Sequence, residues 1–174
     1  PGKQREFAAL LAARGFELVL QSGLGIAAID ETGRNFEETA LLKARHAAAQ
    51  ARLPALADDS GLEVDALDGR PGIHSARFAG PGASDEQNNA ALLAALASVP
   101  RERRTARYRC VLVLVRNATD PCPLIAQGSW EGRIVLDPAG TGGFGYDPHF
   151  APQGFDCTAA QLSPALKNAL SHRG

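Results

Sequence analysis

The sequence predicts a mixed α/β or α+β fold, in which strands and helices form the layers of a single domain over residues 1–174. Two observations favour this class. Residues 33–52 and 84–99 have the features of helices, whereas residues 107–117 form a long apolar run that is rich in β-branched side chains. Hydrophobic residues make up 45% of the chain, which is enough to bury a core.

The expected helices are marked by residues that cap their first turns. Asn35 is followed three residues later by Glu38, which is the capping-box arrangement, and Ser84 with Gln87 repeats it. Pro and Gly residues mark helix ends in the same way. The helices expected on this basis are residues 2–15, 33–52, 84–99 and 163–174.

Strands are expected in the remaining apolar runs, which are residues 16–20, 54–58, 62–67 and 107–117. Residues 123–137 predict either two strands around Gly128 or one bulged strand. The glycines and prolines of residues 68–72 predict a turn, and those of residues 138–150 predict a glycine-rich loop.

The overall composition excludes several classes of protein. A net charge of −1 argues against an electrostatic nucleic-acid binder, which is usually clearly basic. The sequence has neither an apolar run long enough for a membrane span nor a recognisable signal peptide. The three cysteines are widely spaced and form no CxxC pair, which argues against a zinc site and a disulfide framework. We therefore expect a cytoplasmic protein with free thiols.

The most unusual local feature is the pair Asp58 and Asp59, followed directly by Ser60 and Gly61. Two adjacent carboxylates at the tip between two strands repel each other, and a divalent cation would relieve that repulsion. Mg²⁺ prefers oxygen ligands and is typically held by one or two carboxylates together with substrate phosphates. Gly61 would let a phosphate approach the backbone. The alternative is a solvated turn in which the aspartates cap backbone amides.

Glu38 has two interpretations as well. It lies in the first turn of the expected helix, where a carboxylate favours the helix dipole and can close a capping box with Asn35. Alternatively, Glu38 is a second metal ligand that faces the acidic pair. Thr39 and Lys43 are four residues apart on the same helix face, directed toward phosphates or toward solvent.

The glycine-rich loop PAGTGGFGYDP, residues 138–148, can bind an anion through its backbone N–H groups. Phe144 or Tyr146 on this loop can stack on a planar base, an interaction of about 1–3 kcal/mol. The loop lacks the lysine of a P-loop. The alternative is a flexible hairpin loop whose aromatic side chains pack into the core.

Two groups of basic residues remain. Lys167, His172 and Arg173 are close together near the C-terminus, where they can hold a triphosphate or simply complement a helix dipole. Five arginines between residues 101 and 109 form either a nucleic-acid patch or a solvated connector, and the near-zero net charge favours the connector.

Five motifs occur in one order along nearly the whole chain. They are PGKQREF with Lys3, the helix GRNFEETALLKARHAA, the segment ADDSGLEVDALDGRPGIHSARFAG, the loop GGFGYDPHF and the ending LKNALSHRG. Together they resemble the motifs of the Ham1/RdgB-type inosine triphosphate pyrophosphatase family, the XTP/dITP diphosphatases. The resemblance implies a layered fold with a long mixed central sheet flanked by helices, and two lobes with the active cleft between them.

The resemblance also implies a reaction and a substrate class. A deaminated purine nucleoside triphosphate (ITP, dITP or XTP) would react with water to give the monophosphate and pyrophosphate, with Mg²⁺ required. A pocket rich in hydrogen-bond donors accepts a 6-oxo purine, whereas the 6-amino group of adenine leaves such donors unpaired. The family likeness further implies a homodimer that acts on small-molecule nucleotides.

Residue roles follow from motif positions in this resemblance. Glu38 and Asp59 are the implied Mg²⁺ ligands, and Asp59 is also the implied proton acceptor for the attacking water, with Asp58 beside it. Lys3 and Ser60 would contact phosphate or sugar. The residues implied to hold the base and complete the substrate site are Phe144, Gly145, Tyr146, Asp147, Lys167, His172 and Arg173.

Two departures from the family pattern affect these expectations. Thr39 stands where the family has Asn, which would loosen a polar contact near the metal. The first motif lacks its serine or threonine and its asparagine, so we expect a chain shortened at both ends without its first strand. Restoring that segment should raise stability and activity. The alternatives left open are a pyrophosphatase of different base preference and a non-catalytic nucleotide-binding remnant.

Overall fold

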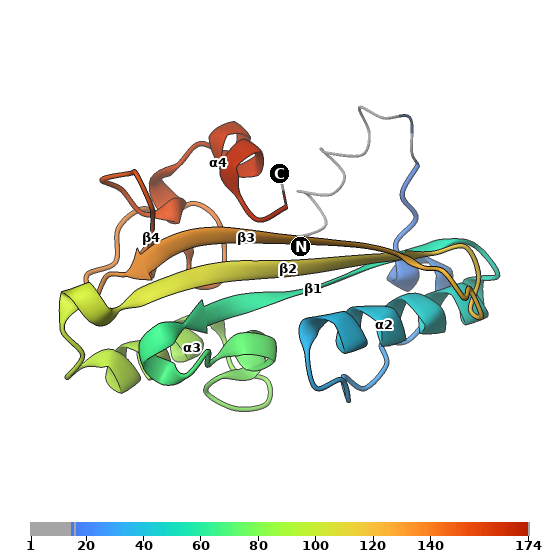
Figure 1. The fold of residues 1–174 in the computed structure, drawn as a ribbon, viewed down its shortest axis with the longest axis horizontal. Helices are drawn as coiled ribbons and strands as arrows, with labels where there is room; N and C mark the ends of the chain where they lie inside the picture. The colour runs from blue at the N-terminus through green and yellow to red at the C-terminus, as the bar shows by residue number, and fades with distance from the viewer. Residues whose placement is uncertain (1–14, 16, 174) are drawn as a thin grey trace. The chain divides into compact units, whose positions relative to one another are not determined.

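We describe the protein from a computed structural model, in which residues 15 and 17–173 are described (Figure 1). The helix expected over residues 2–15, and Lys3 with it, lie outside the described residues except for Gly15. The α-helices are α2 (Phe36–Ala51), α3 (Asp85–Leu96) and α4 (Pro164–Leu170), and the strands are β1 (Ala55–Val64), β2 (Thr105–Val115), β3 (Leu124–Ile134) and β4 (Phe150–Pro152).

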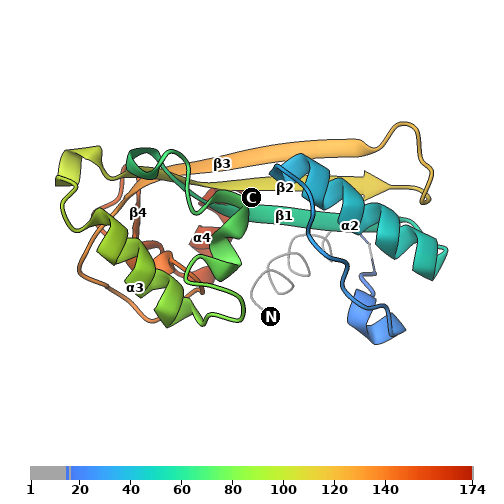
Figure 2. The same cartoon turned by 90° about the horizontal axis from the view of Figure 1, so that it is seen from below.

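The four strands form one sheet in the order β1-β2-β3-β4, and Figures 1 and 2 show the three long strands side by side. All four described strands are antiparallel, whereas the resemblance implied a mixed sheet. The short connection over residues 116–123 reverses the chain between β2 and β3, which makes these two strands antiparallel neighbours. Strand β4 then pairs with the end of β3, with Gly132 opposite Pro152 and Ile134 opposite Phe150.

The chain divides into two compact units. The first unit consists of residues up to Asp59 and of Cys110–Gln127, and the second unit consists of Ser60–Arg109 and Gly128–Gly174. The division passes through β1, β2 and β3, so each of these strands contributes residues to both units. The expected mixed α/β architecture is confirmed.

The first unit is built around helix α2. The Asn35 side chain caps the helix by accepting a hydrogen bond from the Glu38 N–H at 2.8 Å. Ala40, Ala44 and Ala48, spaced by four residues, are fully or almost fully buried on one face of the helix. Such small side chains allow the helix backbone to lie close to its neighbours.

The second unit contains the larger hydrophobic core. Leu62 and Val64 of β1 pack with Leu92 and Leu96 of α3 and with Phe150, and all five are fully buried. Figure 1 shows α3 and α4 on opposite sides of the strands in this unit. The Ser84–Gln87 capping box expected from the sequence is present at the start of α3.

Three expected strands differ from the structure. Residues 54–58 and 62–67 do not form two strands around a turn, because β1 is continuous from Ala55 to Val64. Residues 65–67 form a 3₁₀-helix instead of the end of a strand. Residues 17–20 form no strand; their side chains are exposed, and Leu20 precedes a 3₁₀-helix over Gln21–Leu24.

The other elements agree with the sequence. Helices α2, α3 and α4 occur where they were expected, although each is shorter than its predicted range. The alternatives for residues 123–137 resolve as a single strand, β3. Among the described helices, none has the length and apolar character needed to cross a membrane.

Candidate active site

The acidic pair lies within β1 and not at a turn, so the expected acidic tip is wrong. Successive residues of a strand direct their side chains to opposite faces of the sheet. Asp59 is 6% exposed, and its Oδ1 accepts a hydrogen bond from Lys43 Nζ of α2 at 2.8 Å. Asp58 Oδ2 instead lies 4.0 Å from Cys110 Sγ of β2. The two carboxylates therefore lie on opposite faces of the sheet with different partners. Repulsion between them is no longer an argument for a bound cation.

Gly61 follows the acidic pair for a reason of packing. A Cβ atom at this position would collide with the backbone oxygen of Gly72 and with Ser75 Oγ. Ser75 Oγ also accepts a hydrogen bond from the Leu62 N–H at 2.8 Å and donates one to the Gly72 carbonyl at 2.6 Å. The glycine thus permits the segment at Gly72–Arg77 to lie directly against β1.

Lys43 connects Asp59 with a residue that the sequence analysis did not single out. Its ammonium group lies 2.8 Å from Asp59 Oδ1 and 2.6 Å from Glu31 Oε1. Burial disfavours the charged amine, but hydrogen bonds to the two carboxylates outweigh this and raise the pKa of Lys43. Lys43 therefore stays protonated beside Asp59 at neutral pH.

Glu38 is paired with Arg34 at the start of α2. Glu38 Oε1 lies 3.1 Å from Arg34 Nη2, and Oε2 accepts a hydrogen bond from the Arg34 N–H at 3.0 Å. These hydrogen bonds, the backbone one foremost, lower the pKa of Glu38. The reciprocal bond of the expected capping box therefore reaches Arg34 instead of Asn35. The adjacent Thr39 is buried and donates its hydroxyl proton to the Asn35 carbonyl at 2.9 Å.

The implied metal ligands Glu38 and Asp59 both belong to the first unit, and each carries a cationic partner there. Within residues 15 and 17–173, no group of three or more His, Cys, Asp or Glu side chains is arranged to hold a metal ion. Mg²⁺ is commonly bound through one or two carboxylates and completes its shell with water and phosphate. The carboxylate donor set is therefore compatible with Mg²⁺ bound together with a substrate.

In the second unit, Asp147 is the centre of a hydrogen-bond network. It is 2% exposed, and its Oδ2 accepts from Lys167 Nζ at 2.7 Å and from the Phe144 N–H at 2.8 Å. Its Oδ1 accepts from the Tyr108 hydroxyl at 3.2 Å. Three donors therefore hold this buried carboxylate in one orientation. The network fixes the loop and the lysine relative to each other.

The side chains around Asp147 offer an aromatic surface and a cation. Lys167 Nζ lies 4.5 Å from the centre of the Phe144 ring, within the range of a cation–π interaction. Tyr108 stacks on His172, with ring centres 5.2 Å apart and an angle of 13° between the planes. Burial raises the pKa of Tyr108 far above its usual value, and the Asp147 charge adds to the effect. Sequence reasoning missed Tyr108, since only the fold brings β2 to this loop.

The loop separates its two aromatic residues. Tyr146 belongs to the hydrophobic core, is 4% exposed, and donates its hydroxyl proton to the Ser75 carbonyl at 2.8 Å. Phe144 is half-buried. Of the two aromatics considered for base stacking, Phe144 is therefore the one with a partly open ring. A cavity of about 480 Å³ adjoins the loop at Phe144, Gly145 and Asn89, which is within the size range of small-molecule sites.

The C-terminal residues also contact Ser60 of β1. Arg173 is 9% exposed, and its Nη2 donates a hydrogen bond to Ser60 Oγ. At Gly128, a Cβ atom would collide with the His172 carbonyl, so the C-terminal segment lies tightly against β3. The second unit thus connects most of the implied substrate residues by contacts, namely Ser60 with Arg173, and Phe144 with Asp147 and Lys167.

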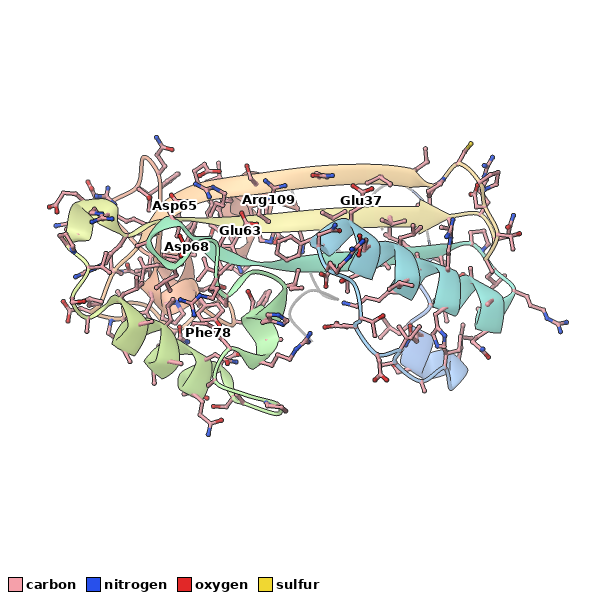
Figure 3. All side chains as sticks on the ribbon, turned by 60° about the horizontal axis from the view of Figure 1, so that its bottom comes forward. Glu37, Glu63, Asp65, Asp68, Phe78 and Arg109 are labelled. Atoms are coloured by element: carbon pink, nitrogen blue, oxygen red, sulfur yellow. The ribbon has the colours of Figure 1, made fainter. Side chains whose placement is uncertain are left out.

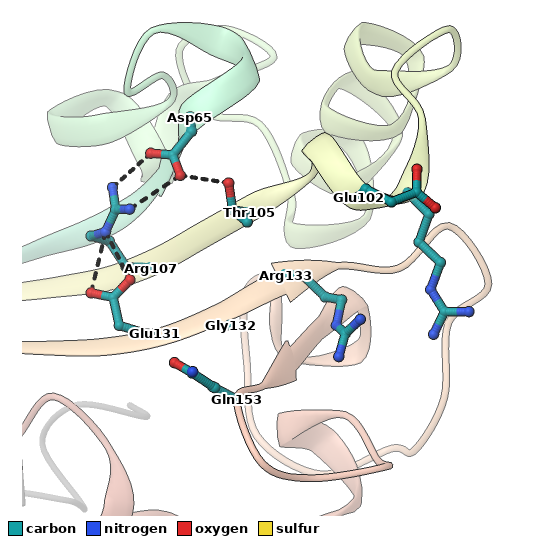
Figure 4. Close-up of a pocket in the computed structure, with 9 residues that line it drawn as sticks. Asp65, Glu102, Thr105, Arg107, Glu131, Gly132, Arg133 and Gln153 are labelled. Atoms are coloured by element: carbon teal, nitrogen blue, oxygen red, sulfur yellow. Dashed lines mark hydrogen bonds and ion pairs between the residues drawn. The ribbon is translucent and has the colours of Figure 1, made fainter.

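A second cavity, of about 340 Å³, lies in the same unit but contains none of the implied site residues (Figure 4). Arg107 of β2 crosses it with ion pairs of 2.8 Å to Asp65 and 3.0 Å to Glu131 on the flanking strand β3. Figure 3 labels Glu63 near the end of β1 and Asp65 just after the strand ends. The hydrogen bonds from Arg107 lower the pKa of Asp65. The arginine run is therefore not wholly the solvated connector that was expected, because Arg107 lies within β2 and forms ion pairs with Asp65 and Glu131.

The fold is that of a mixed α/β protein, and the network around Asp147 lies on a glycine-rich loop beside a cavity. A solved HAM1 protein from Coxiella burnetii has the same fold, with a TM-score of 0.92 and 46% identity over 99% of this chain and 87% of that one. A dITP/XTP pyrophosphatase from Methylococcus capsulatus is 58% identical over 99% of this chain and 86% of the relative. One from Yersinia pestis is 55% identical over 100% of this chain and 88% of the relative.

The model of the Ham1 family matches residues 1–174. The chain belongs to the Ham1 family, which confirms the resemblance expressed by the five sequence motifs.

Proposed function

We propose that this chain is a Mg²⁺-dependent nucleoside-triphosphate pyrophosphatase that converts ITP, dITP or XTP to the monophosphate and pyrophosphate. The observation that carries the proposal is the Phe144–Asp147–Lys167 network, which presents an aromatic ring and a fixed ammonium group. Its relatives' name, dITP/XTP pyrophosphatase, supports the same substrate class.

Base recognition follows from the chemistry of Lys167. Its ammonium group is a hydrogen-bond donor only, so it matches the 6-oxo group of a deaminated purine and not the 6-amino group of adenine. Phe144 supplies the stacking surface, and the Gly145 and Tyr146 backbone shapes the loop beneath it. His172 and Arg173, with Ser60, would contact the sugar and the phosphates. Lys3 would contribute a further phosphate contact.

The reaction itself is assigned to the first unit. The oxygen of a water molecule forms a bond to the α-phosphorus, the bond from that phosphorus to the bridging oxygen breaks, and pyrophosphate leaves. Asp59 accepts the proton from the water, and Asp58 adds negative charge beside it. Glu38 and Asp59 would hold Mg²⁺, which neutralises phosphate charge and orients the triphosphate. Lys43 donates a hydrogen bond to Asp59 Oδ1 and so holds this carboxylate in place.

The proposal is tested by measuring pyrophosphate release from ITP, dITP, XTP, GTP and ATP, with Mg²⁺ and with a chelator. We expect turnover of ITP or XTP far above ATP, lost when the metal is removed. Asp59→Asn should reduce kcat by about 10²–10⁴, the usual contribution of a general base. The exposed Asp68→Asn is the matched control and should retain the wild-type rate.

Each contrary outcome has a distinct meaning. Release of single phosphate, or equal rates for ATP and ITP, would reject the proposed reaction or the base preference. Tight ITP binding without turnover would indicate a binding-only protein.

We further propose a cytoplasmic homodimer. Leu124 of β3 is 69% exposed, and an exposed apolar side chain of this size fits an interface with a second copy. The three cysteines are free, which fits a reducing compartment. Light scattering that gives the mass of one chain would contradict the dimer, and activity outside the cytosolic fraction of cells would contradict the location.

A further inference from the structure

Two side chains of helix α3 bind the backbone of Gly145 in the glycine-rich loop. The Gly145 N–H donates a hydrogen bond to Asp85 Oδ2 at 2.7 Å, and the Gly145 carbonyl accepts one from Asn89 Nδ2 at 2.9 Å. We propose that Asp85 and Asn89 are positioning residues that fix the base-binding loop and thereby determine base discrimination. This inference rests on the proposed function, because it concerns the same loop.

The two side chains form a clamp that is itself rigid. Asp85 and Asn89 are four residues apart, so they project from the same face of α3. Asn89 Nδ2 also donates to the backbone carbonyl of Asp85 at 2.9 Å, which fixes the amide on its own helix. The backbone N–H and the backbone carbonyl of Gly145 are therefore both held by side chains from one turn of α3.

Helix α3 cannot easily move away from the loop. Its first turn is closed by the Ser84–Gln87 capping box, and Leu92 and Leu96 are fully buried in the core. The buried Asn88 accepts a hydrogen bond from the Ala79 N–H at 2.9 Å and donates one to the Ala76 carbonyl at 3.2 Å. Because α3 is fixed to the core, side chains that project from it can hold the loop in one position.

The clamp acts where the loop most needs support. Gly145 has a φ of +61°, in the left-handed region, and it stands between Phe144 and Tyr146. Tyr146 is anchored in the core, and the Phe144 N–H is bound to Asp147. If the Gly145 peptide rotates, the Phe144 ring moves relative to Lys167. A displacement of about 1 Å in a substrate-positioning group can cost about 10²-fold in rate.

The first test compares Asp85→Ala and Asn89→Ala with Glu86→Ala, which removes a carboxylate from the same helix turn. The readout is the ratio of kcat/KM for ITP to kcat/KM for ATP. Partial unfolding lowers both values equally and leaves the ratio unchanged, so the ratio reports positioning. We expect the ratio to fall about tenfold in the two clamp variants and to stay at the wild-type value in Glu86→Ala.

The conservative variant Asp85→Asn keeps an acceptor oxygen for the Gly145 N–H and should restore most of the ratio. An unchanged ratio in both Asp85→Ala and Asn89→Ala would overturn the inference. An equal fall in Glu86→Ala would overturn it as well, since the effect would then belong to the helix terminus.

A second measurement does not depend on turnover. Hydrogen exchange of the backbone amides in residues 143–147 should accelerate in Asp85→Ala and stay unchanged in β2. If wild-type protein hydrolyses no nucleotide, the proposed function fails, while the exchange result still decides whether the clamp exists. Unchanged exchange in residues 143–147 would refute the clamp.

Discussion

One ion pair from each unit shows how differently two charged pairs can be exposed to solvent. In the first unit, Arg34 and Glu38 form an ion pair whose side chains are 88% and 40% exposed. In the second unit, Lys167 and Asp147 form an ion pair whose side chains are 9% and 3% exposed. Exposed pairs contribute little to stability and exchange readily with ions in solution, whereas a buried pair is fixed by its surroundings. The comparison separates an exposed ion pair, which contributes little to stability, from a buried one that fixes the geometry of the candidate site.

The largest effect should come from breaking the buried pair. Lys167→Met leaves the Asp147 carboxylate buried without its ammonium partner, so we expect a loss of about 3–5 kcal/mol in the free energy of unfolding. Arg34→Met breaks the exposed pair and should leave the urea midpoint at the wild-type value. Equal changes in the two urea midpoints would show that the buried and the exposed ion pair contribute equally to stability.

A smaller effect is expected at the glycines. Gly61→Ala introduces a Cβ atom against the Gly72 carbonyl in the second unit, which should destabilise the protein by about 1–3 kcal/mol. Gly23→Ala, in the first unit, meets no atom within 4 Å and should change stability by less than about 0.5 kcal/mol. Thermal unfolding of the two variants measures the contrast, and a stable Gly61→Ala protein would contradict the close approach at β1.

The smallest effect concerns Tyr108. Tyr108→Phe removes the hydroxyl that bonds Asp147, for an expected loss of about 1 kcal/mol at neutral pH. The folded state raises the pKa of Tyr108 above the usual 10.0, so the folded protein keeps this proton when the unfolded chain loses it. The protonated Tyr108 therefore contributes to the free energy of unfolding below pH 10.0, and this contribution is lost as the pH rises above that value.

Unfolding by urea between about pH 8 and about pH 11 tests the tyrosine. The stability of wild-type protein should fall more steeply with pH than that of Tyr108→Phe, and the two curves should converge in alkali. Parallel curves would show that Tyr108 does not titrate on unfolding in this range.

Local signals in the sequence predicted the helices well. Asn35 and Ser84 cap α2 and α3 as expected, because a cap is a contact between residues three positions apart. The same kind of local reasoning failed at β1. Asp58 to Gly61 have the composition of a turn, but the glycine is explained by contacts with Gly72 and Ser75, which are distant in the sequence.

In the candidate site, too, local motifs were predicted from the sequence and contacts between distant residues were missed. The loop residues Phe144 and Asp147 and the cation Lys167 were identified from motifs, and the structure joins them. Tyr108 was missed because it reaches Asp147 across 39 residues of chain. Asp85 resembled an ordinary helix-terminal acid, since its bond to Gly145 spans 60 residues. Such contacts depend on tertiary packing and leave no periodic pattern in the sequence.

The continuous path of β1 has a consequence for how this protein can change in length. A strand alternates its faces at every residue, so inserting or deleting one residue between Arg52 and Asp58 would exchange the sides on which Asp58 and Asp59 project. Asp59 would then turn away from Lys43. The few residues that lead into Asp58 must therefore keep their number.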